Sequence, residues 1–280
     1  MASLEDIQFH YDVSNDFFML FLDETYHAYS CGIWNNALTL EEAQKNKLQR
    51  LANFAKIKPG DQVLDIGCGW GGMIDFCQQE RQTKKVIGLT LSQAQQNYLE
   101  AKQFSTQICS WENFIADTKF DAIVSIGAME HFASIEDQKQ NKQVEVYRNF
   151  FKKCFDLSTQ DAHLGLQTIV TYNKPNTLKK MKDVYYLLKH VFPGSVLPRI
   201  QDLQIAMQGL YEPIQLTTIG NDYVKTLETW KNRLHFNKEW IVANYNETLW
   251  QHYNHYFDCA RSGFEDGTIN LLQMSLRKIN

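Results

Sequence analysis

A glycine-rich turn behind a short apolar strand is the segment whose residue types best suit cofactor binding. The strand, residues 62–66, contains Asp65, and residues 67–72 then read Gly-Cys-Gly-Trp-Gly-Gly. Glycine allows a sharp bend and lets a ligand approach without a Cβ in the way. A strand, a glycine turn and a helix supply such an opening at the carboxyl end of a parallel sheet, where α/β proteins bind nucleotide-like cofactors. The alternative is an ordinary tight connection between a strand and a helix.

The same turn discriminates between cofactors. Its glycine spacing is close to the dinucleotide fingerprint, in which a helix N-terminus receives a pyrophosphate and an acidic residue about twenty positions later holds a ribose. Asp65 would repel a pyrophosphate, whereas it would attract a cation or accept a hydrogen bond from an amine. The next strand, residues 84–89, leads into Thr90-Leu-Ser, with no carboxylate for the ribose. This context favours S-adenosylmethionine, which carries an amino group and a sulfonium and no phosphate.

Alternating strand and helix patterns position this turn. A capping box, Thr39-Leu-Glu-Glu42, opens a helix that is expected to run to Phe54. Further helices are expected near residues 71–80, 92–103 and 142–156, and strands near 62–66, 84–89, 106–110, 120–126 and 163–170. This βαβα rhythm predicts an α/β fold with a parallel sheet covered on both faces.

The rhythm breaks after residue 170. A mostly helical segment at 176–191 precedes a strand near 214–219 and a last strand near 269–277, which could pair antiparallel, with helices at 224–262 between them. An insertion of this size usually carries function, and we expect it to form a lid over the substrate. The chain is expected to be a single domain, residues 1–280. Its expected parts are a helical cap (1–56), a cofactor-binding core (57–170), lid insertions with one core strand (171–262) and the last core strand (263–280).

Composition narrows the class of protein and its compartment. With 280 residues the chain can bury a substantial core. Its net charge of −4 does not indicate a basic surface that would bind nucleic acid. No apolar run approaches the roughly 18 residues of a membrane span. The N-terminus lacks the basic and apolar regions of a signal peptide. The six cysteines lack paired spacing, so we expect neither a metal site nor disulfides, and a reducing cytoplasm is the expected location.

Ordered sequence blocks run along almost the whole chain. They lie at residues 10–17, 29–31, 64–71, 88–95, 111–112, 125–132, 192–194 and 223–227. On these blocks the chain resembles the cyclopropane fatty acid and mycolic acid cyclopropane synthase family of S-adenosylmethionine-dependent methyltransferases. The resemblance implies a class I, Rossmann-like methyltransferase with a seven-stranded, mostly parallel sheet, an antiparallel last strand and helical lid insertions.

The resemblance also assigns contacts to S-adenosylmethionine. They are Tyr29, Ser30, Asp65, Gly67, Gly69, Gly71, Thr90, Gln95, Trp111, Glu112 and Ile126. A hydroxyl at Thr90 and an amide at Gln95 can hydrogen-bond the ribose diol. An indole at Trp111 can lie on adenine, while Glu112 accepts a hydrogen bond from the adenine amino group. The alternatives are a helix capping box with Ser92 for Gln95 and core packing for Trp111.

In this family the π-bond of an unsaturated acyl chain takes up the methyl group, and a bound bicarbonate then removes a proton to close a cyclopropane. The resemblance places four groups at the bicarbonate site: Cys31, Glu130, Tyr223 and the backbone amide of Ile126. Glu130 follows a strand, at the edge where α/β enzymes place their chemistry; its alternative is a solvated loop carboxylate. Cys31 alone would be a small buried hydrophobe. His131 could be a base but is expected to hold the loop.

One position departs from the family pattern. The family's histidine at the bicarbonate site falls on Gln167 of this chain, within Leu-Gly-Leu-Gln-Thr at 164–168. A glutamine can donate two hydrogen bonds but cannot carry a proton or a positive charge. Bicarbonate would lose charge assistance there. A bicarbonate cofactor and cyclopropanation are therefore less well supported by the sequence than S-adenosylmethionine.

Three functions remain open. The first is methyl transfer to an unsaturated lipid or carrier-bound acyl chain, which gives a cyclopropane or a methyl-branched product. The second is a C- or N-methyltransferase of a small alkaloid or isoprenoid metabolite, in which Glu130 takes the proton directly; Gln167 favours this function. The third is a silent lipid- or cofactor-binding protein. Because no amphipathic basic segment stands out, a carrier-bound or free apolar substrate is expected rather than bilayer lipid.

Overall fold

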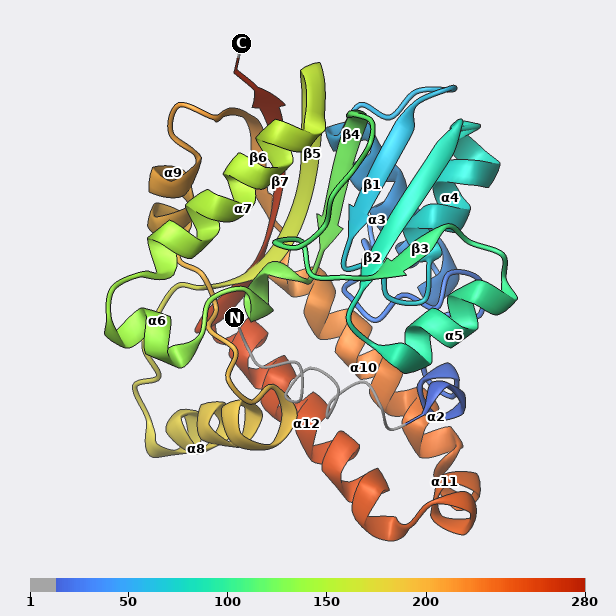
Figure 1. Cartoon of the computed structure of the whole chain (residues 1–280). Helices are drawn as coiled ribbons and strands as arrows, with labels where there is room; N and C mark the ends of the chain where they lie inside the picture. The colour runs from blue at the N-terminus through green and yellow to red at the C-terminus, as the bar shows by residue number, and fades with distance from the viewer. Residues whose placement is uncertain (1–13, 280) are drawn as a thin grey trace.

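A seven-stranded sheet forms the centre of the computed structural model, which describes residues 14–279 (Figure 1). The strands are β1 (Gln62–Ile66), β2 (Lys85–Thr90), β3 (Thr106–Ile108), β4 (Phe120–Ile126), β5 (Ser158–Thr171), β6 (Tyr211–Thr218) and β7 (Ile269–Lys278). Their order across the sheet is β3-β2-β1-β4-β5-β7-β6. The first five pair in parallel, whereas β7 runs antiparallel to both β5 and β6. The predicted fold class is therefore confirmed, including the antiparallel last strand.

Helices cover both faces of this sheet (Figure 1). The helices are α2 (Asn15–Met19), α3 (Leu40–Phe54), α4 (Gly72–Arg81), α5 (Gln93–Ala101), η1 (Met129–His131), α6 (Ile135–Lys139), α7 (Gln143–Leu157), α8 (Leu178–Tyr186), η2 (Leu187–Val191), α9 (Ile200–Met207), α10 (Gly220–Phe236), α11 (Lys238–Asn244) and α12 (Glu247–Glu265). Side chains that alternate along β1 divide the core between two helical layers. Val63 packs in the cluster of α3 and α4, while Leu64 and Ile66 pack in the cluster of α7 and α9.

A third, aromatic cluster covers the carboxyl edge of the sheet. It is built by α2, α10 and α12, which extend from that edge in Figure 1. Phe21 packs edge-on against Phe257, with ring centroids 5.4 Å apart. The ring centroids of Tyr29 and Trp230 are 5.2 Å apart. Aromatic rings bury a large apolar area each. The helices α10 and α12 of the second half of the chain thus build, together with α2, a separate hydrophobic core over the carboxyl edge of the sheet.

Several elements differ in extent from the sequence expectation. The helices expected at 224–262 are present as α10, α11 and α12 and together extend from 220 to 265; Asn237 ends α10, and Asn246 caps α12 through its side chain. The segment at 176–191 ends in a π-helical turn, η2. β5 begins at Ser158 rather than near 163. Residues 159–161 are polar and only partly buried or exposed, so the sequence carries no apolar strand pattern there. Residues 10–13 of the first resemblance block lie outside the described residues.

Between residues 14 and 279, no helix is both long enough and apolar enough to cross a membrane.

Gly165 on β5 allows α3 to approach the sheet closely. A Cβ at this position would lie 2.7 Å from the carbonyl oxygen of Leu51 and 3.3 Å from the Cβ of Ala55. Because a backbone carbonyl within a helix cannot turn aside, any larger residue must push α3 outward. The helix would then move relative to the cofactor side of the sheet.

Replacing Gly165→Ala is expected to lower the free energy of unfolding by about 1–3 kcal/mol, the usual range for overpacking, as measured by denaturant unfolding. Gly263→Ala in α12 is the matched control, since its Cβ would meet only the Ile269 side chain, at 3.2 Å. Alanine also gains up to about 1 kcal/mol of helix propensity there. Equal stabilities of the two variants would contradict the close approach of α3.

Candidate active site

The glycine turn folds as the sequence indicates and exposes backbone to a cavity. Gly67 and Gly69 have φ angles of 82° and 55°, which favour glycine. A Cβ on Gly67 would lie 2.6 Å from the Cβ of Ala128, whereas the space beside Gly69 is open. Gly71 is the N-cap residue of α4, and a Cβ on it would meet the side chains of Leu99 and Phe104 at 2.7 and 2.8 Å. Two glycines therefore open the site, and the third holds α4 and α5 together.

The turn lies in the wall of a cavity of about 150 Å³. The predicted cofactor residues that line it are Tyr29, Ser30, Asp65, Gly67, Gly69, Thr90, Gln95, Trp111 and Ile126. Gly71 and Glu112 are not part of this wall. Trp111 is buried between Phe132 and Phe150, and the next side chain therefore turns outward, which leaves Glu112 exposed. The structure thus brings most of the predicted cofactor residues together, but not Gly71 or Glu112.

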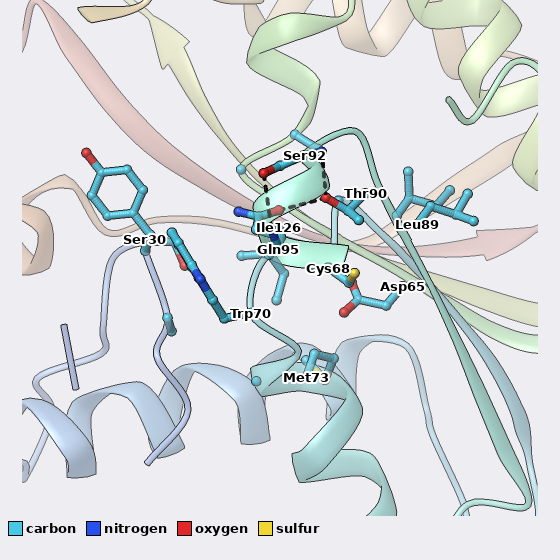
Figure 2. Close-up of a pocket in the computed structure, with 18 of the residues that line it drawn as sticks. Ser30, Asp65, Cys68, Trp70, Met73, Leu89, Thr90, Ser92, Gln95 and Ile126 are labelled. Atoms are coloured by element: carbon cyan, nitrogen blue, oxygen red, sulfur yellow. Dashed lines mark hydrogen bonds between the residues drawn. The ribbon is translucent and has the colours of Figure 1, made fainter. Parts of the chain in front are cut away.

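A polar cluster at the end of β2 faces the same cavity (Figure 2). The Thr90 hydroxyl donates to the side-chain Oε1 of Gln95 at 2.7 Å. The backbone N–H of Gln95 donates to Oγ of Ser92 at 3.2 Å. Gln95 therefore takes part in the helix cap through its backbone and lines the cavity through its side chain. The alternative capping box with Ser92 forms only in half, because the Ser92 N–H donates to Oγ1 of Thr90 at 3.2 Å and not to the Gln95 side chain.

Asp65 and Lys47 are ionisable groups buried in this wall. Burial raises the pKa of the Asp65 carboxyl to about 7, and Lys47 opposes that shift. Burial likewise lowers the pKa of the Lys47 ammonium to about 8. Its Nζ donates to Oγ of Ser30 at 2.9 Å, and it forms no ion pair within residues 14–279. A buried cation with donors to spare is suited to an anionic group of a ligand.

Sequence reasoning missed Lys47, although a signal was present. On the helix that begins after Thr39, the positions of Ala43, Lys47 and Leu51 are four residues apart and share one buried face. A lysine within an apolar stripe is rarely buried without a role. The stripe marks Lys47 as a residue that faces the sheet rather than the solvent.

A second, mostly apolar cavity of about 410 Å³ adjoins the first. Four residues belong to both walls: Tyr29, Ser30, Gly127 and His131. The predicted catalytic residues Glu130, His131, Gln167 and Tyr223 all line the second cavity. A ligand in the first cavity can therefore present a reactive group directly to a ligand in the second.

Glu130 is the buried carboxyl group of the second cavity. Its Oε1 accepts a hydrogen bond from the backbone N–H of Ile169 at 2.6 Å, while Oε2 is buried with no hydrogen-bond partner among the described residues. Burial raises its pKa to about 7. His131 is held by Ser195, with 2.8 Å between Nδ1 and Oγ, and burial lowers its pKa to about 4. Near neutral pH, Glu130 can exchange a proton, whereas His131 is neutral and fixed in place.

The other predicted catalytic residues have different surroundings. Oε1 of Gln167 accepts from Nε2 of Gln273 at 2.7 Å, and the Tyr223 ring stacks on Phe264 with centroids 4.4 Å apart. Cys31 is fully buried and lines neither cavity. Its Sγ lies 3.1 Å from the carbonyl oxygen of Gly32 and faces α10 rather than the acceptor space. Cys31 therefore packs in the aromatic cluster, which also contains Tyr223, and is not part of the wall that Glu130, Gln167 and Tyr223 share.

The strand order, the glycine turn at the end of β1 and the paired cavities define a class I S-adenosylmethionine-dependent methyltransferase. The family model of mycolic acid cyclopropane synthetase matches residues 1–274. The chain therefore belongs to the mycolic acid cyclopropane synthetase family, as its sequence blocks indicated.

Individual relatives agree with this assignment. The chain is 32% identical over 292 residues to the S-adenosylmethionine-dependent methyltransferase UmaA of Mycobacterium tuberculosis, with 98% of this chain and 97% of that protein covered. The structure of the cyclopropane synthase MmaA2 from Mycobacterium tuberculosis matches with a TM-score of 0.89 at 29% identity, covering 98% of each chain. The cyclopropane synthase CmaA1, complexed with SAH and CTAB, matches with a TM-score of 0.88 at 30% identity, covering 99% of each chain. The protein is an enzyme of the methyltransferase class, and its cofactor is S-adenosylmethionine.

Replacing Lys47→Met is expected to weaken binding of S-adenosylhomocysteine roughly tenfold to hundredfold, the usual effect of losing a hydrogen bond to a charged group. Binding of 5′-methylthioadenosine, which lacks the amino-acid carboxylate, is expected to stay unchanged. Isothermal titration calorimetry measures both affinities. The matched control is Lys45→Met, an exposed lysine of the same helix that pairs with Glu80. Equal losses for the two ligands would contradict a contact between Lys47 and the carboxylate.

Proposed function

We propose that this enzyme methylates the double bond of an unsaturated acyl chain and gives a cyclopropane or methyl-branched product. One observation carries the proposal. The second, mostly apolar cavity of about 410 Å³ adjoins the first, which we call the cofactor cavity, and the buried carboxyl group of Glu130 lies in its wall. Apolar walls with a few convergent polar groups are typical of sites for apolar small molecules. A long hydrocarbon chain suits such a cavity better than a polar metabolite does.

The residues of the first cavity fit S-adenosylmethionine. Gly67 and Gly69 leave room for the ligand beside the backbone, because a Cβ on Gly67 would collide with Ala128. Asp65 can accept from the amino group of the methionine part, and Lys47 can donate to its carboxylate. Thr90 and Gln95 can bind the ribose. When bound, the cofactor supplies an electrophilic methyl group on a sulfonium.

Glu130 serves as the base of the proposed reaction. Transfer of the methyl group to the acyl double bond would break its bond to sulfur, release S-adenosylhomocysteine and leave the positive charge on the acyl intermediate, which must then lose a proton. Loss of that proton from the new methyl group closes a cyclopropane, whereas loss from a neighbouring carbon leaves a methyl branch with a double bond. Oε2 of Glu130 has no hydrogen-bond partner among the described residues and can accept the proton. Its raised pKa suits it to both accept and release protons near neutrality.

Bicarbonate is not required in this scheme. The group of residues expected to hold it is incomplete at the second cavity, since Cys31 lines neither cavity and Gln167 is neutral. Oε1 of Gln167 is also occupied by Gln273. We infer that Glu130 takes the proton directly.

The second candidate function is methylation of a small alkaloid or isoprenoid acceptor. The hydrogen bond between Gln167 and Gln273 favours it, because this pair replaces a charged anion site by a neutral one. An amine acceptor would also release its proton to Glu130. The size and apolar character of the second cavity favour the acyl chain instead.

Replacing Glu130→Gln is expected to lower kcat by about 10²–10⁴, the usual contribution of a general base, with the affinity for S-adenosylhomocysteine unchanged. Because a carboxylate is a base only when ionised, kcat of the wild type should rise as the pH increases through about 7. His131→Asn should keep this pH profile, because His131 is already neutral there. Transfer of label from methyl-labelled S-adenosylmethionine measures kcat. Full turnover by Glu130→Gln would remove Glu130 as the base.

Replacing Gln167→His tests whether a charged anion site can be restored. Titration with bicarbonate should leave the wild-type rate unchanged and increase the rate of the variant, because a histidine can assist an anion. Rates are measured with the same acyl substrate for both proteins. A wild type that depends on bicarbonate would show that Gln167 already holds this anion.

A further inference from the structure

We propose that α8 docks the enzyme on an anionic lipid bilayer and so brings the acyl chain to the mouth of the second cavity. The inference rests on the acyl acceptor proposed above. Four large apolar side chains of α8 and η2 are exposed: Leu178 at 78%, Met181 at 49%, Tyr185 at 60% and Leu188 at 40%. Steps of three and four residues place them on one face of the helix. We name this face the α8 stripe.

Positive charge flanks the α8 stripe. Between residues 172 and 191 the chain carries five lysines and one aspartate, although the net charge of the whole chain is −4. Lys179 and Lys180 pair with Asp183 and Asp266. The other three, Lys174, Lys182 and Lys189, are exposed and form no ion pair with a described residue. Lysines beside an exposed apolar stripe are the pattern of a helix that lies on an anionic membrane surface.

The opposite side of α8 and η2 lines the second cavity, which we call the acceptor cavity. Val184 and Leu187 belong to the cavity wall, and Leu188 belongs both to the wall and to the stripe. Ile135 on α6 is likewise exposed and lines the cavity. Figure 1 shows α8 at the margin of the molecule, beside α12 and away from the sheet. The cavity therefore opens next to the stripe, and an acyl chain can pass from a bilayer into it without crossing water.

A bilayer matches these features better than an acidic carrier protein does. The lysines alone would suit either partner. A carrier's acidic surface would leave Leu178, Met181 and Tyr185 in water, whereas the boundary between headgroups and acyl chains accepts apolar and tyrosine side chains. Sequence reasoning favoured a carrier-bound or free substrate, because it found no amphipathic basic segment. The sequence pattern does not reveal the α8 stripe, because apolar residues on the inner face of the helix obscure the alternation between an apolar and a polar face.

Sedimentation with vesicles tests the proposal. Wild-type enzyme is expected to bind vesicles of phosphatidylcholine with phosphatidylglycerol, less so at high salt, and to bind pure phosphatidylcholine weakly. The variants Leu178→Asp/Tyr185→Asp and Lys182→Glu/Lys189→Glu should each lower the partition coefficient about tenfold or more. Ile115→Asp is the matched control, since Ile115 is 85% exposed and lies between β3 and β4. It should bind as the wild type does.

Vesicle binding that is unchanged in both stripe variants would overturn the proposal, and so would a wild type that binds neither kind of vesicle. Binding to an acidic carrier protein in place of vesicles would assign the surface to that partner. Methylation of an acyl substrate dispersed in detergent separates this inference from the proposed function. The stripe variants should retain that activity. Activity without vesicle binding defeats the docking alone, while vesicle binding without any acyl methylation defeats the proposed acceptor.

Discussion

Desolvation of three ionisable side chains shapes the carboxyl edge of this sheet. Asp65, Lys47 and Glu130 are almost fully buried, and burial raises the pKa of each carboxyl group and lowers the pKa of the ammonium. A buried charge is costly until a partner of opposite charge or a hydrogen bond compensates it. Two of these groups face the cofactor cavity and one faces the acceptor cavity. The free energy lost by burying them can be recovered when the ligands bind.

The fold maintains that burial from two sides. The parallel strands end at one edge, which collects the glycine turn, the end of β2 and the η1 turn within one region. The aromatic cluster of α2, α10 and α12 then closes this region from solvent. Tyr29 belongs to the walls of both cavities and also packs on Trp230 of the cluster. The helical insertions therefore shape the acceptor space and help keep water from the buried groups.

The sequence predicts what depends on local pattern. The strand before Asp65, the capping box at Thr39 and the turn at 67–72 are local signals, and each lies where it was expected. Cys31 and Glu112 could not be placed in this way, because the direction of a side chain depends on what packs against its neighbours. Lys47 differs from these two residues, because its spacing from Ala43 and Leu51 on α3 already indicates a buried face. The α8 stripe required knowledge of which apolar residues remain exposed.

The central claim is that the methyl group reaches an acyl double bond and that a proton then leaves to Glu130. Mass spectrometry of acyl products formed with trideuteromethyl S-adenosylmethionine tests it most directly. We predict label in the acyl chain, with one deuterium lost when a cyclopropane forms and none lost when a methyl branch forms. Label found only in an amine or other small acceptor, with none in acyl chains, would contradict the account.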